Sequence, residues 1–394
     1  MTSIADQDAM PGWLTLLLAT SCALIIANLY YAQPLVGPIS ASLGLSPQAA
    51  GLVVTVTQLG YGAGLLLLVP LADLMENRRL VVLCLVGTVL ALAGAALSRT
   101  AAPFLTFAAL MGLCCVSIQV LVPYAAHLAP EASRGRVVGN VMSGVMLGIM
   151  LARPVSSFGA SILPWHEVFA LSAALMAALA AVLWFTLPER RPASGLRYGA
   201  LLGSMAALLR DTPVLQRRAA YHTFMFGAFS LFWTTVPLLL AHTYGLGQRG
   251  IALFGLAGVA GAIVAPLAGR AADRGWGARG TGLTMGVVAA AFLLARVGLW
   301  GGGVGLACLV VSAIVLDAGV TAALIFSQRA IFALGPAARG RLNGLFMAIF
   351  FLGGAASSAI GAWAYAAGGW SLATWAGLAL PAAALAWFAT EHRV

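Results

Sequence analysis

The chain has 394 residues, of which 61% are hydrophobic and only 8% are charged, and its mean hydropathy is +0.98. Roughly a quarter of residues are charged in an ordinary soluble domain, so this composition excludes a soluble protein and indicates one embedded in a bilayer. The formal net charge of +10 comes from arginine alone, since the sequence has no lysine, and in a membrane protein it reports loop placement rather than a nucleic-acid partner.

Apolar segments follow one another along the whole chain. A membrane-spanning helix needs about 20 apolar residues, and clusters of Gly, Pro and Arg separate twelve such segments. Runs of this length without period-two alternation predict helices rather than a β-barrel. We expect an all-α membrane protein with spans at 13–34, 49–71, 80–98, 102–126, 138–160, 167–187, 219–241, 250–272, 281–299, 304–326, 342–364 and 370–389.

The arginines predict which way the spans point. When the loops are assigned alternately to two sides, 17 of the 21 arginines fall on one side, against Arg99, Arg249 and Arg296 on the other. The remaining arginine, Arg153, lies inside a span. The positive-inside rule then places both termini in the cytoplasm.

The longest loop predicts the domain boundary. Residues 188–218 separate an N-terminal six-helix bundle, 1–187, from a C-terminal one, 219–394. Within this linker, apolar residues recur at helical spacing among basic ones, which predicts an amphipathic helix on the cytoplasmic face. A partly ordered linker is the alternative. The apolar residues are Leu201, Leu202, Met205, Leu208 and Leu209.

Two loop signatures occur twice in the same order. Asp73 followed by Arg78 and Arg79 is echoed 200 residues later by Asp273 and Arg274. Residues 130–136, with Arg-Gly-Arg at their end, are answered by residues 336–341 at an offset of 205. A half built twice in the same orientation indicates a transporter whose two bundles rock about a central site.

Arg153 and Asp317 are the charges that we expect deep within the bilayer. At 1.5 Å per residue their depths differ by only about 5 Å, so they can meet or face one cavity. A buried charge costs on the order of 3 kcal/mol and marks a functional site by default. Three hypotheses stand: Asp317 carries the coupling proton while Arg153 holds it ionised, the two form a static ion pair, or Arg153 binds an anionic cargo that Asp317 orients.

Polar and aromatic residues of spans 1, 2, 4 and 7 predict the lining of a substrate cavity. Amides, hydroxyls and aromatic faces suit a polar, neutral or weakly charged molecule. Hydrogen bonds between helices are the alternative role for each of them. His222, close to the basic end of its span, is expected at the membrane interface. The cavity residues are Asn28, Tyr31, Gln33, Gln58, Tyr61, Gln119, Trp233 and Thr234.

Other chemistries find no support in the sequence. The five cysteines lie in apolar runs without metal-ligand spacing, and no metal or other cofactor is expected. The chain has no HExxH sequence, no paired intramembrane carboxylates and no Walker sequence, so neither an enzyme nor an ATP-driven pump is predicted. An ion gradient is the remaining energy source.

The spans and loops together resemble the major facilitator superfamily, whose fold is two parallel six-helix bundles. The resemblance covers essentially the whole chain, and three local segments are similar to bacterial sugar and drug efflux permeases of that family. They are Asn28-Leu-Tyr-Tyr-Ala-Gln-Pro-Leu35, Thr57-Gln-Leu-Gly-Tyr-Gly62 and Pro70-Leu-Ala-Asp73.

The match to the family's motifs is uneven. In the loop between spans 2 and 3, Val69, Leu74 and Glu76 replace a glycine, an arginine and a second glycine, whereas the later copy with Gly269 and Asp273 fits better. In span 5, glycines of an antiporter motif remain, but Arg153 stands before Pro154.

The resemblance also implies a cytoplasmic gate. In the family's arrangement, Asp73 and Asp273 each face the N-terminal end of a helix in the opposite half. A carboxylate there gains about 0.3–1 kcal/mol, so Asp73, Arg78, Asp273 and Arg274 are expected to form the gate. An ordinary capping or loop role is the alternative for the carboxylates.

These expectations combine into one function. We expect a proton-coupled secondary active transporter of the bacterial cytoplasmic (inner) membrane, which exports a small polar or amphipathic organic molecule by alternating access. Its partners are that substrate, protons and membrane lipid, without nucleic acid, and it is expected to act as a monomer. The alternatives are an uncoupled facilitator and an importer of an organic anion bound by Arg153.

Overall fold

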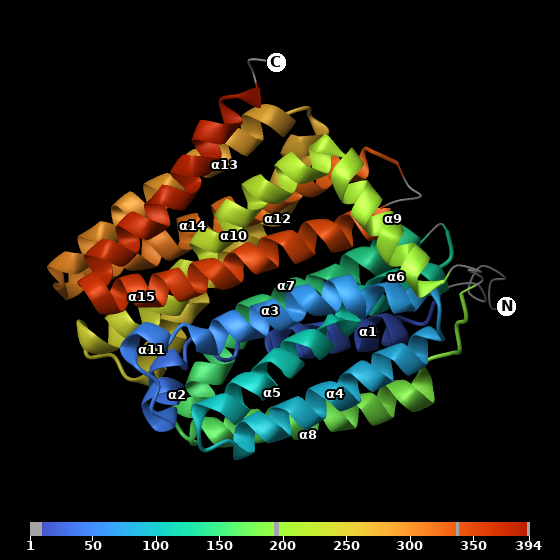
Figure 1. The fold of residues 1–394 in the computed structure, drawn as a ribbon, viewed down its shortest axis with the longest axis horizontal. Helices are drawn as coiled ribbons and strands as arrows, with labels where there is room; N and C mark the ends of the chain where they lie inside the picture. Colours follow the sequence, from blue (N-terminus) through green and yellow to red (C-terminus); the bar gives the residue numbers. More distant parts are fainter. Residues whose placement is uncertain (1–9, 132, 193–196, 336–338, 392–394) are drawn as a thin grey trace, which may run out of the picture.

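The computed structural model describes residues 10–131, 133–192, 197–335 and 339–391, and every regular element in these ranges is a helix. Figure 1 shows the helices running beside one another along the long axis. Ten of them are long and apolar enough to cross a membrane, and the shorter apolar α1 accompanies them. The prediction of an all-α membrane protein is confirmed.

The first half of the chain comprises α1 to α8. Within it, α1 and α2 form the first span, η2, α3 and η3 the second, and α5, η4 and α6 the fourth. The bounds are α1 (Gly12–Ala27), α2 (Val36–Leu43), η2 (Pro47–Ala49), α3 (Leu52–Leu67), η3 (Val69–Asp73), α4 (Asn77–Leu97), α5 (Ala101–Cys114), η4 (Cys115–Ser117), α6 (Ile118–Leu128), α7 (Arg134–Ala160) and α8 (Trp165–Thr186).

The second half begins after α9, the helix of the linker. In it, α11, η5 and α12 form one span, and α15 contains two. The bounds are α9 (Tyr198–Asp211), α10 (Pro213–His242), α11 (Gln248–Gly255), η5 (Leu256–Val259), α12 (Ala260–Asp273), α13 (Gly277–Ala295), η6 (Arg296–Trp300), α14 (Gly302–Phe332) and α15 (Arg339–Phe388).

The first and eighth predicted spans are interrupted in the structure, as is the fourth by η4. α1 ends at Ala27, and turns with i to i+3 hydrogen bonds carry the chain to α2 at Val36. Pro34 gives a physical reason, because it has no N–H to donate and disfavours helix at the residue before it. In the eighth span, the 3₁₀ segment η5 separates α11 from α12.

The last two predicted spans form one helical element with a sharp break. Gly368 and Gly369 have non-helical dihedral angles inside α15, and Gly369 has a φ of +62°. Only glycine adopts such a φ at little cost, so this pair marks where the eleventh span turns into the twelfth. With α15 counted as two spans and with α1, the structure has the twelve spans of the predicted fold.

The halves meet along two sides. α3 lies beside α15 (Figure 1), and α7 packs on α11 and η5. Two further contacts, α2 with α10 and η2 with α15, join the halves at the end of the molecule where α2 and α11 lie. We call this end the far end.

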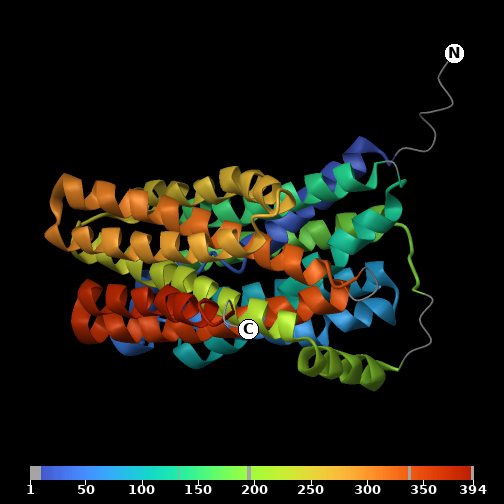
Figure 2. The ribbon, with the colours of Figure 1, turned by 90° about the horizontal axis from the view of Figure 1, so that it is seen from above.

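The opposite end, here called the basic end, gathers the arginine-rich loops. Arg341 at the start of α15 donates to Ser204 of α9, and Arg218 pairs with Glu391 near the C-terminal end. α9 lies on the outside of the bundle (Figure 2) and contacts η3, α10 and α15. Ala132 and residues 336–338 of the repeated loop motif lie outside the described residues.

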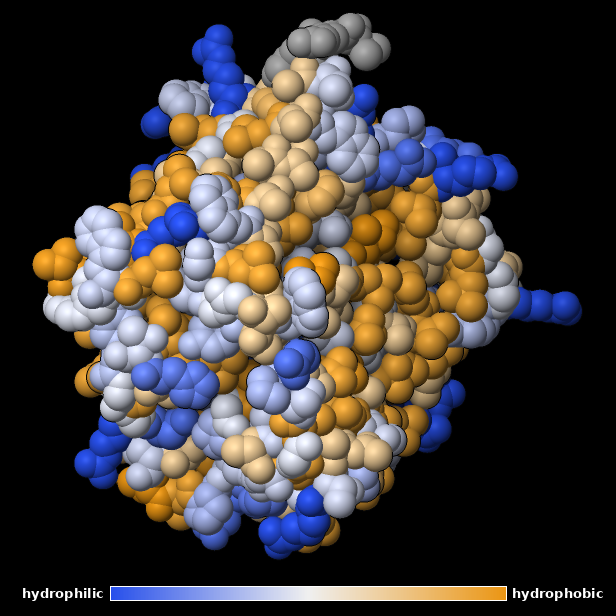
Figure 3. Space-filling view, turned by 60° about the vertical axis from the view of Figure 1, so that its left-hand side comes forward, coloured by the Kyte–Doolittle hydropathy of each residue, from blue (hydrophilic) through white to orange (hydrophobic). Residues whose placement is uncertain are grey.

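Hydrophobic side chains cover much of the molecular surface. Figure 3 shows broad orange areas, with many of the strongly hydrophilic residues projecting at the rim. Large apolar side chains such as Phe185, Leu253 and Trp300 are more than two-thirds exposed. A soluble monomer rarely shows such contiguous apolar surface, whereas lipid covers it in a bilayer.

Candidate functional site

A buried ion pair joins the two halves of the molecule. Arg153 Nη1 of α7 lies 3.9 Å from Asp317 Oδ2 of α14. The two residues are 2% and 5% exposed, so neither charge is hydrated as it would be at a surface. Taking charges out of water is costly, and removing one partner of such a pair leaves the other uncompensated.

Each charge also has a hydrogen-bond partner in its own half. Trp233 Nε1 of α10 donates to Asp317 Oδ1 at 2.8 Å, and Arg153 Nε donates to Gln33 Oε1 at 2.8 Å. Asp317 therefore keeps its orientation through Trp233, and Arg153 keeps its own through Gln33. The direct contact between the charges, at 3.9 Å, is longer than a hydrogen bond.

Three aromatic rings surround the Arg153 guanidinium. Its Cζ lies 4.1 Å from the ring centroid of Trp233, 4.8 Å from that of Phe229 and 5.4 Å from that of Tyr30. Phe229 and Trp233 share one face of α10 because they are four residues apart. A desolvated cation over an aromatic face is stabilised by about 2 kcal/mol, so the rings offset part of the cost of burial.

Breaks in two spans make room for this cluster. The turns after α1 place Tyr30 and Gln33 beside Arg153, and η5 brings Gly258 over the ion pair. A Cβ atom on Gly258 would lie 2.9 Å from Asp317 Oδ2 and 3.1 Å from Arg153 Nη1. Only a glycine fits so close, and interrupted helices are typical of binding sites in transporters.

Two donors of the cluster lack an acceptor. Arg153 Nη2 and Gln33 Nε2 are both buried and make no hydrogen bond in the structure. Most buried polar atoms in proteins are paired, so each such orphan calls for a physical explanation.

A second set of contacts between the halves is uncharged. Gln58 Nε2 of α3 donates to Ser230 Oγ of α10 at 2.6 Å, and Thr55 Oγ1 donates to the Ala355 carbonyl of α15 at 3.1 Å. Tyr61 of α3 packs on Phe351 of α15 with ring centroids 4.5 Å apart. These groups do not change charge near neutral pH.

The sequence comparisons agree with this architecture. Residues 16–333 match the family model of the Major Facilitator Superfamily. The chain belongs to this superfamily. It is 40% identical over 385 residues to the uncharacterized transporter YgaY of Escherichia coli O157:H7, with 96% of each chain covered.

A further relative supports this assignment, and a solved structure supports the fold. A probable transporter of Streptomyces coelicolor is 35% identical over 386 residues, which cover 96% of this chain and 86% of that protein. The crystal structure of a bacterial homologue of the human lysosomal transporter Spinster has a TM-score of 0.75 at 14% identity, with 95% of each chain covered, and supports the fold alone. The chain is a multi-pass membrane transporter and not an enzyme.

The predicted cavity residues are largely enclosed in this conformation of the transporter. Seven of the eight are buried, and Gln119 is partly exposed. Besides Gln33, Trp233 and Gln58, most bond to other helices: Asn28 accepts from Ser172, Gln119 donates to Tyr61, and Thr234 pairs with Ser358. Hydrogen bonds between helices are thus their visible role, and a lining role stays a prediction.

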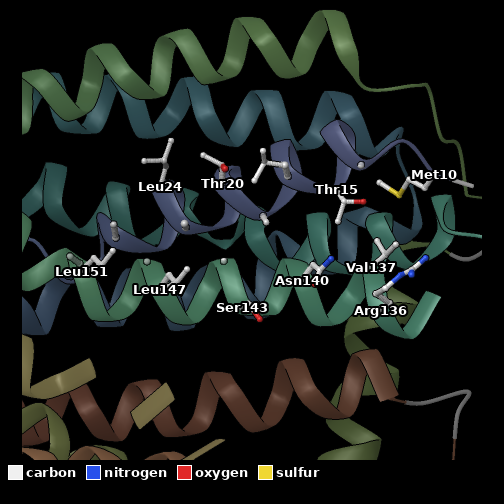
Figure 4. Close-up of a pocket in the computed structure, with 18 of the residues that line it drawn as sticks. Met10, Thr15, Thr20, Leu24, Arg136, Val137, Asn140, Ser143, Leu147 and Leu151 are labelled. Atoms are coloured by element: carbon white, nitrogen blue, oxygen red, sulfur yellow. The ribbon is translucent and has the colours of Figure 1, made fainter. Parts of the chain in front are cut away.

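A groove of about 740 Å³ lies elsewhere, between α1 and α7. Figure 4 shows its labelled side chains spread along the two helices, with Arg136 at the basic end and Leu151 at the other. Leu147 and Leu151 of its wall are 52% and 43% exposed, as expected for a surface in contact with lipid. Tyr31 is the one predicted cavity residue in its lining.

His222 is enclosed by the protein, and its expected depth at the membrane interface stays a prediction. The side chain is 1% exposed and stacks with Phe346, and its ring contacts Phe350 edge-on at 4.6 Å. The aromatic residues of α15 that enclose it could not be assigned to it from the sequence of α10 alone.

The predicted gate residues lie at the basic end. Among the described residues, Arg78 and Asp273 bond to partners near their own half and not to the opposite half. Arg78 donates to Glu189 Oε1 and to the Leu187 carbonyl, and Asp273 pairs with Arg329 at the end of α14. Asp73 and Arg274 are exposed.

Glu76, which stands at a glycine position of the family motif, caps α4 by accepting from the Arg78 and Arg79 amides. This cap was not predicted from the sequence.

Proposed function

We propose that this protein is a proton-coupled secondary transporter of a small organic molecule, which works by alternating access in the bacterial inner membrane. The bundles rock between a state closed at the far end and a state closed at the basic end. The observation that carries the proposal is the buried pair of Arg153 and Asp317, which spans the two halves.

In this scheme the ion pair holds the far end closed. Arg153 and Gln33 belong to the first half, whereas Asp317 and Trp233 belong to the second, so opening the far end separates the charges. Separating unneutralised charges in a medium of low dielectric is costly. The closed far end is therefore stable while both groups are charged.

A proton on Asp317 releases this restraint. The neutral carboxyl loses its attraction to Arg153 but still bonds to Trp233, so it can leave with its own half. Because the direct contact is 3.9 Å long, protonation breaks no hydrogen bond between the two charged groups. A transmembrane potential supplies about 2.3 kcal/mol per charge per 100 mV, which is sufficient to bias such an equilibrium.

The other state would be held by the basic end. With this end in the cytoplasm, Asp73 and Asp273 would approach helix N-termini of the opposite half once the basic end closes. The contacts at the far end, namely α2 with α10 and η2 with α15, support the assignment of the described conformation to the state closed at the far end. The gate residues then act in the alternate state.

The proposal is tested by spin-label distances across the far end. Labels at Ser42 of α2 and Thr243 after α10 are exposed and lie in different halves. We expect the short distance to dominate at pH 8 and a longer distance to gain population at pH 5.5. Asp317→Asn, which mimics the protonated carboxyl, should give the longer distance at both pH values.

Two outcomes would contradict proton coupling through this pair. One is an unchanged distance distribution in the wild-type protein between the two pH values, which favours an uncoupled facilitator. The other is a full pH response retained in Asp317→Asn. Asp211→Asn, an exposed carboxylate paired with Arg210 on α9, is the matched control and should respond like the wild type.

A further inference from the structure

We infer that Arg153 and Gln33 form a carboxylate-binding subsite and that the cargo is a small organic monocarboxylate with a flat or apolar body. The inference rests on the proposed function and names its substrate class. It starts from the two buried donors without acceptors, Arg153 Nη2 and Gln33 Nε2.

The two free donors belong to one preorganised unit. The Nε and Nη2 atoms form one edge of the planar guanidinium, so the open Nη2 lies on the edge that already faces Gln33. Because Gln33 Oε1 accepts from Arg153 Nε at 2.8 Å, the amide must turn its Nε2 donor away from Nε. One hydrogen bond thus orients both free N–H groups.

A carboxylate satisfies this donor set better than a neutral acceptor. It offers two oxygens with several lone pairs, and hydrogen bonds from a guanidinium to it are charge-assisted. The surroundings suit an organic body, since the ring of Tyr30, which belongs to the same half as Arg153, lies beside the guanidinium. This ring stays there when Phe229 and Trp233 withdraw with the second half. Aromatic faces bury apolar surface and stack on flat groups.

The donors Arg153 and Gln33 stay together when the far end opens. Room for a ligand beside them exists only after that opening. In the described state, Gly258 lies against the ion pair and leaves no room for a ligand carboxylate between the charges. Arg153, Gln33 and Tyr30 all belong to the first half, so they stay together when the second half withdraws Asp317, Trp233 and Gly258. The ligand carboxylate then binds at Nη2 and Gln33 Nε2, beside the position at Nη1 that Asp317 has left.

Charge balance couples this ligand to the proton. The pair of Arg153 and Asp317 is neutral, and protonation of Asp317 leaves one uncompensated positive charge, which a bound carboxylate neutralises. Proton and anion therefore each increase the affinity for the other, as linkage requires. The two travel in the same direction, so this inference predicts symport, whereas export was expected from the family resemblance alone.

The test is a thermal-shift titration of the purified protein in detergent with sodium benzoate. The neutral analogue benzamide and the cation benzylamine are the comparison ligands. We expect benzoate to stabilise the protein at pH 5.5, with an affinity about tenfold lower at pH 8, and the two analogues to have little effect. In a weakly buffered solution at pH 7, benzoate binding should be accompanied by proton uptake.

Gln33→Glu tests the subsite without deleting a side chain. The new carboxylate keeps an acceptor for Arg153 Nε but replaces the free donor by a negative oxygen. We expect benzoate affinity to fall by tenfold or more, because the ligand loses one charge-assisted hydrogen bond and meets a like charge. Gln328→Glu is the matched control, because Gln328 bonds to Asn343 between α14 and α15 and should leave benzoate binding unchanged.

Different failures are distinguishable. Equal effects of benzoate and benzamide, or no effect of either, would overturn the carboxylate subsite and leave the free donors to water. Proton release on benzoate binding would overturn symport. Both results are independent of the spin-label response to pH, which is measured without ligand and tests the proposed function alone.

Discussion

Around α7 the two halves meet through a buried ion pair, whereas along α3 they meet through amide, hydroxyl and aromatic groups. Arg153 and Asp317 form the first contact, at 3.9 Å, and Gln58 and Ser230 form part of the second, at 2.6 Å. The first contact changes strength when one carboxylate takes up a proton. The second has no group that titrates near neutral pH.

The difference indicates a division of labour between the two contacts. A neutral hydrogen bond contributes about 1 kcal/mol whatever the pH. A buried charge pair adds little net stability, but removing one of its two charges is costly because the other charge stays buried without a partner. The α3 side therefore suits a permanent contact, and the α7 side suits a contact that opens and closes.

The largest effect should come from Arg153→Met, which removes one charge of the pair. Asp317 is then buried with Trp233 as its remaining partner, and the loss of stability should be about 3–5 kcal/mol at pH 8. Because a protonated Asp317 carries no charge, the loss should shrink as the pH falls. Thermal unfolding at pH 8 and pH 5.5 measures the difference.

The control for this change is Arg296→Met. Arg296 also stacks over a tryptophan, Trp375, at 4.2 Å, but its hydrogen bonds go to Thr374 and the Ser371 carbonyl rather than to a carboxylate. Its replacement should cost less and should not depend on pH. Adding Asp317→Asn to Arg153→Met should restore most of the stability. Equal losses at both pH values would show that Asp317 is not left charged.

A smaller effect is expected from adding one methyl group to either contact. Gly258→Ala places its Cβ 2.9 Å from Asp317 and should cost about 1–3 kcal/mol, because the tightly packed cluster must shift. Gly62→Ala on the α3 side meets Leu352 at 3.4 Å, an ordinary contact, and should be nearly neutral. The pH response of the labelled far end should change in Gly258→Ala only. Similar behaviour of the two variants would contradict a special role for the α7 contact.

Much of the fold could be predicted because bilayer thickness and charge patterning act on single segments. Long apolar runs predict the spans. The loop signature that contains Asp73 recurs 200 residues later with Asp273, and this repeat predicts the two halves. The breaks after Ala27 and at η5 were not predicted, because the apolar run continues across each of them and hydrophobicity alone does not mark where a helix is interrupted. Pro34 was a usable local signal for the first break.

The site was only partly predictable, for a related reason. Arg153 and Asp317 stand out because charge is rare in a span, and a depth estimate was sufficient to suggest that they meet. Their surroundings depend on how distant helices rotate, which no local pattern specifies. The spacing of Phe229 and Trp233 on one face of α10 was visible, but Gly258 had no signal that linked it to Asp317.

Changes to the neutral contact should have a modest effect. Gln58→Leu removes the hydrogen bond to Ser230 and should cost about 1–2 kcal/mol, equally at pH 8 and pH 5.5. The double variant with Ser230→Ala should be closer to the wild type, because no polar partner then remains unpaired. Thermal unfolding measures both. A pH-dependent loss would mean that the two contacts are not chemically distinct.

The smallest effect on stability is expected from Asp73→Asn and Asp273→Asn at the basic end. Both side chains are exposed in the described state, so unfolding should change by no more than about 0.5 kcal/mol. If they hold the basic end closed in the alternate state, neutralising them should depopulate that state. The labels at Ser42 and Thr243 should then favour the short distance at pH 5.5, opposite to the shift in Asp317→Asn. Distributions identical to the wild type in both variants would remove these carboxylates from the gate and leave the basic end to be held by other contacts.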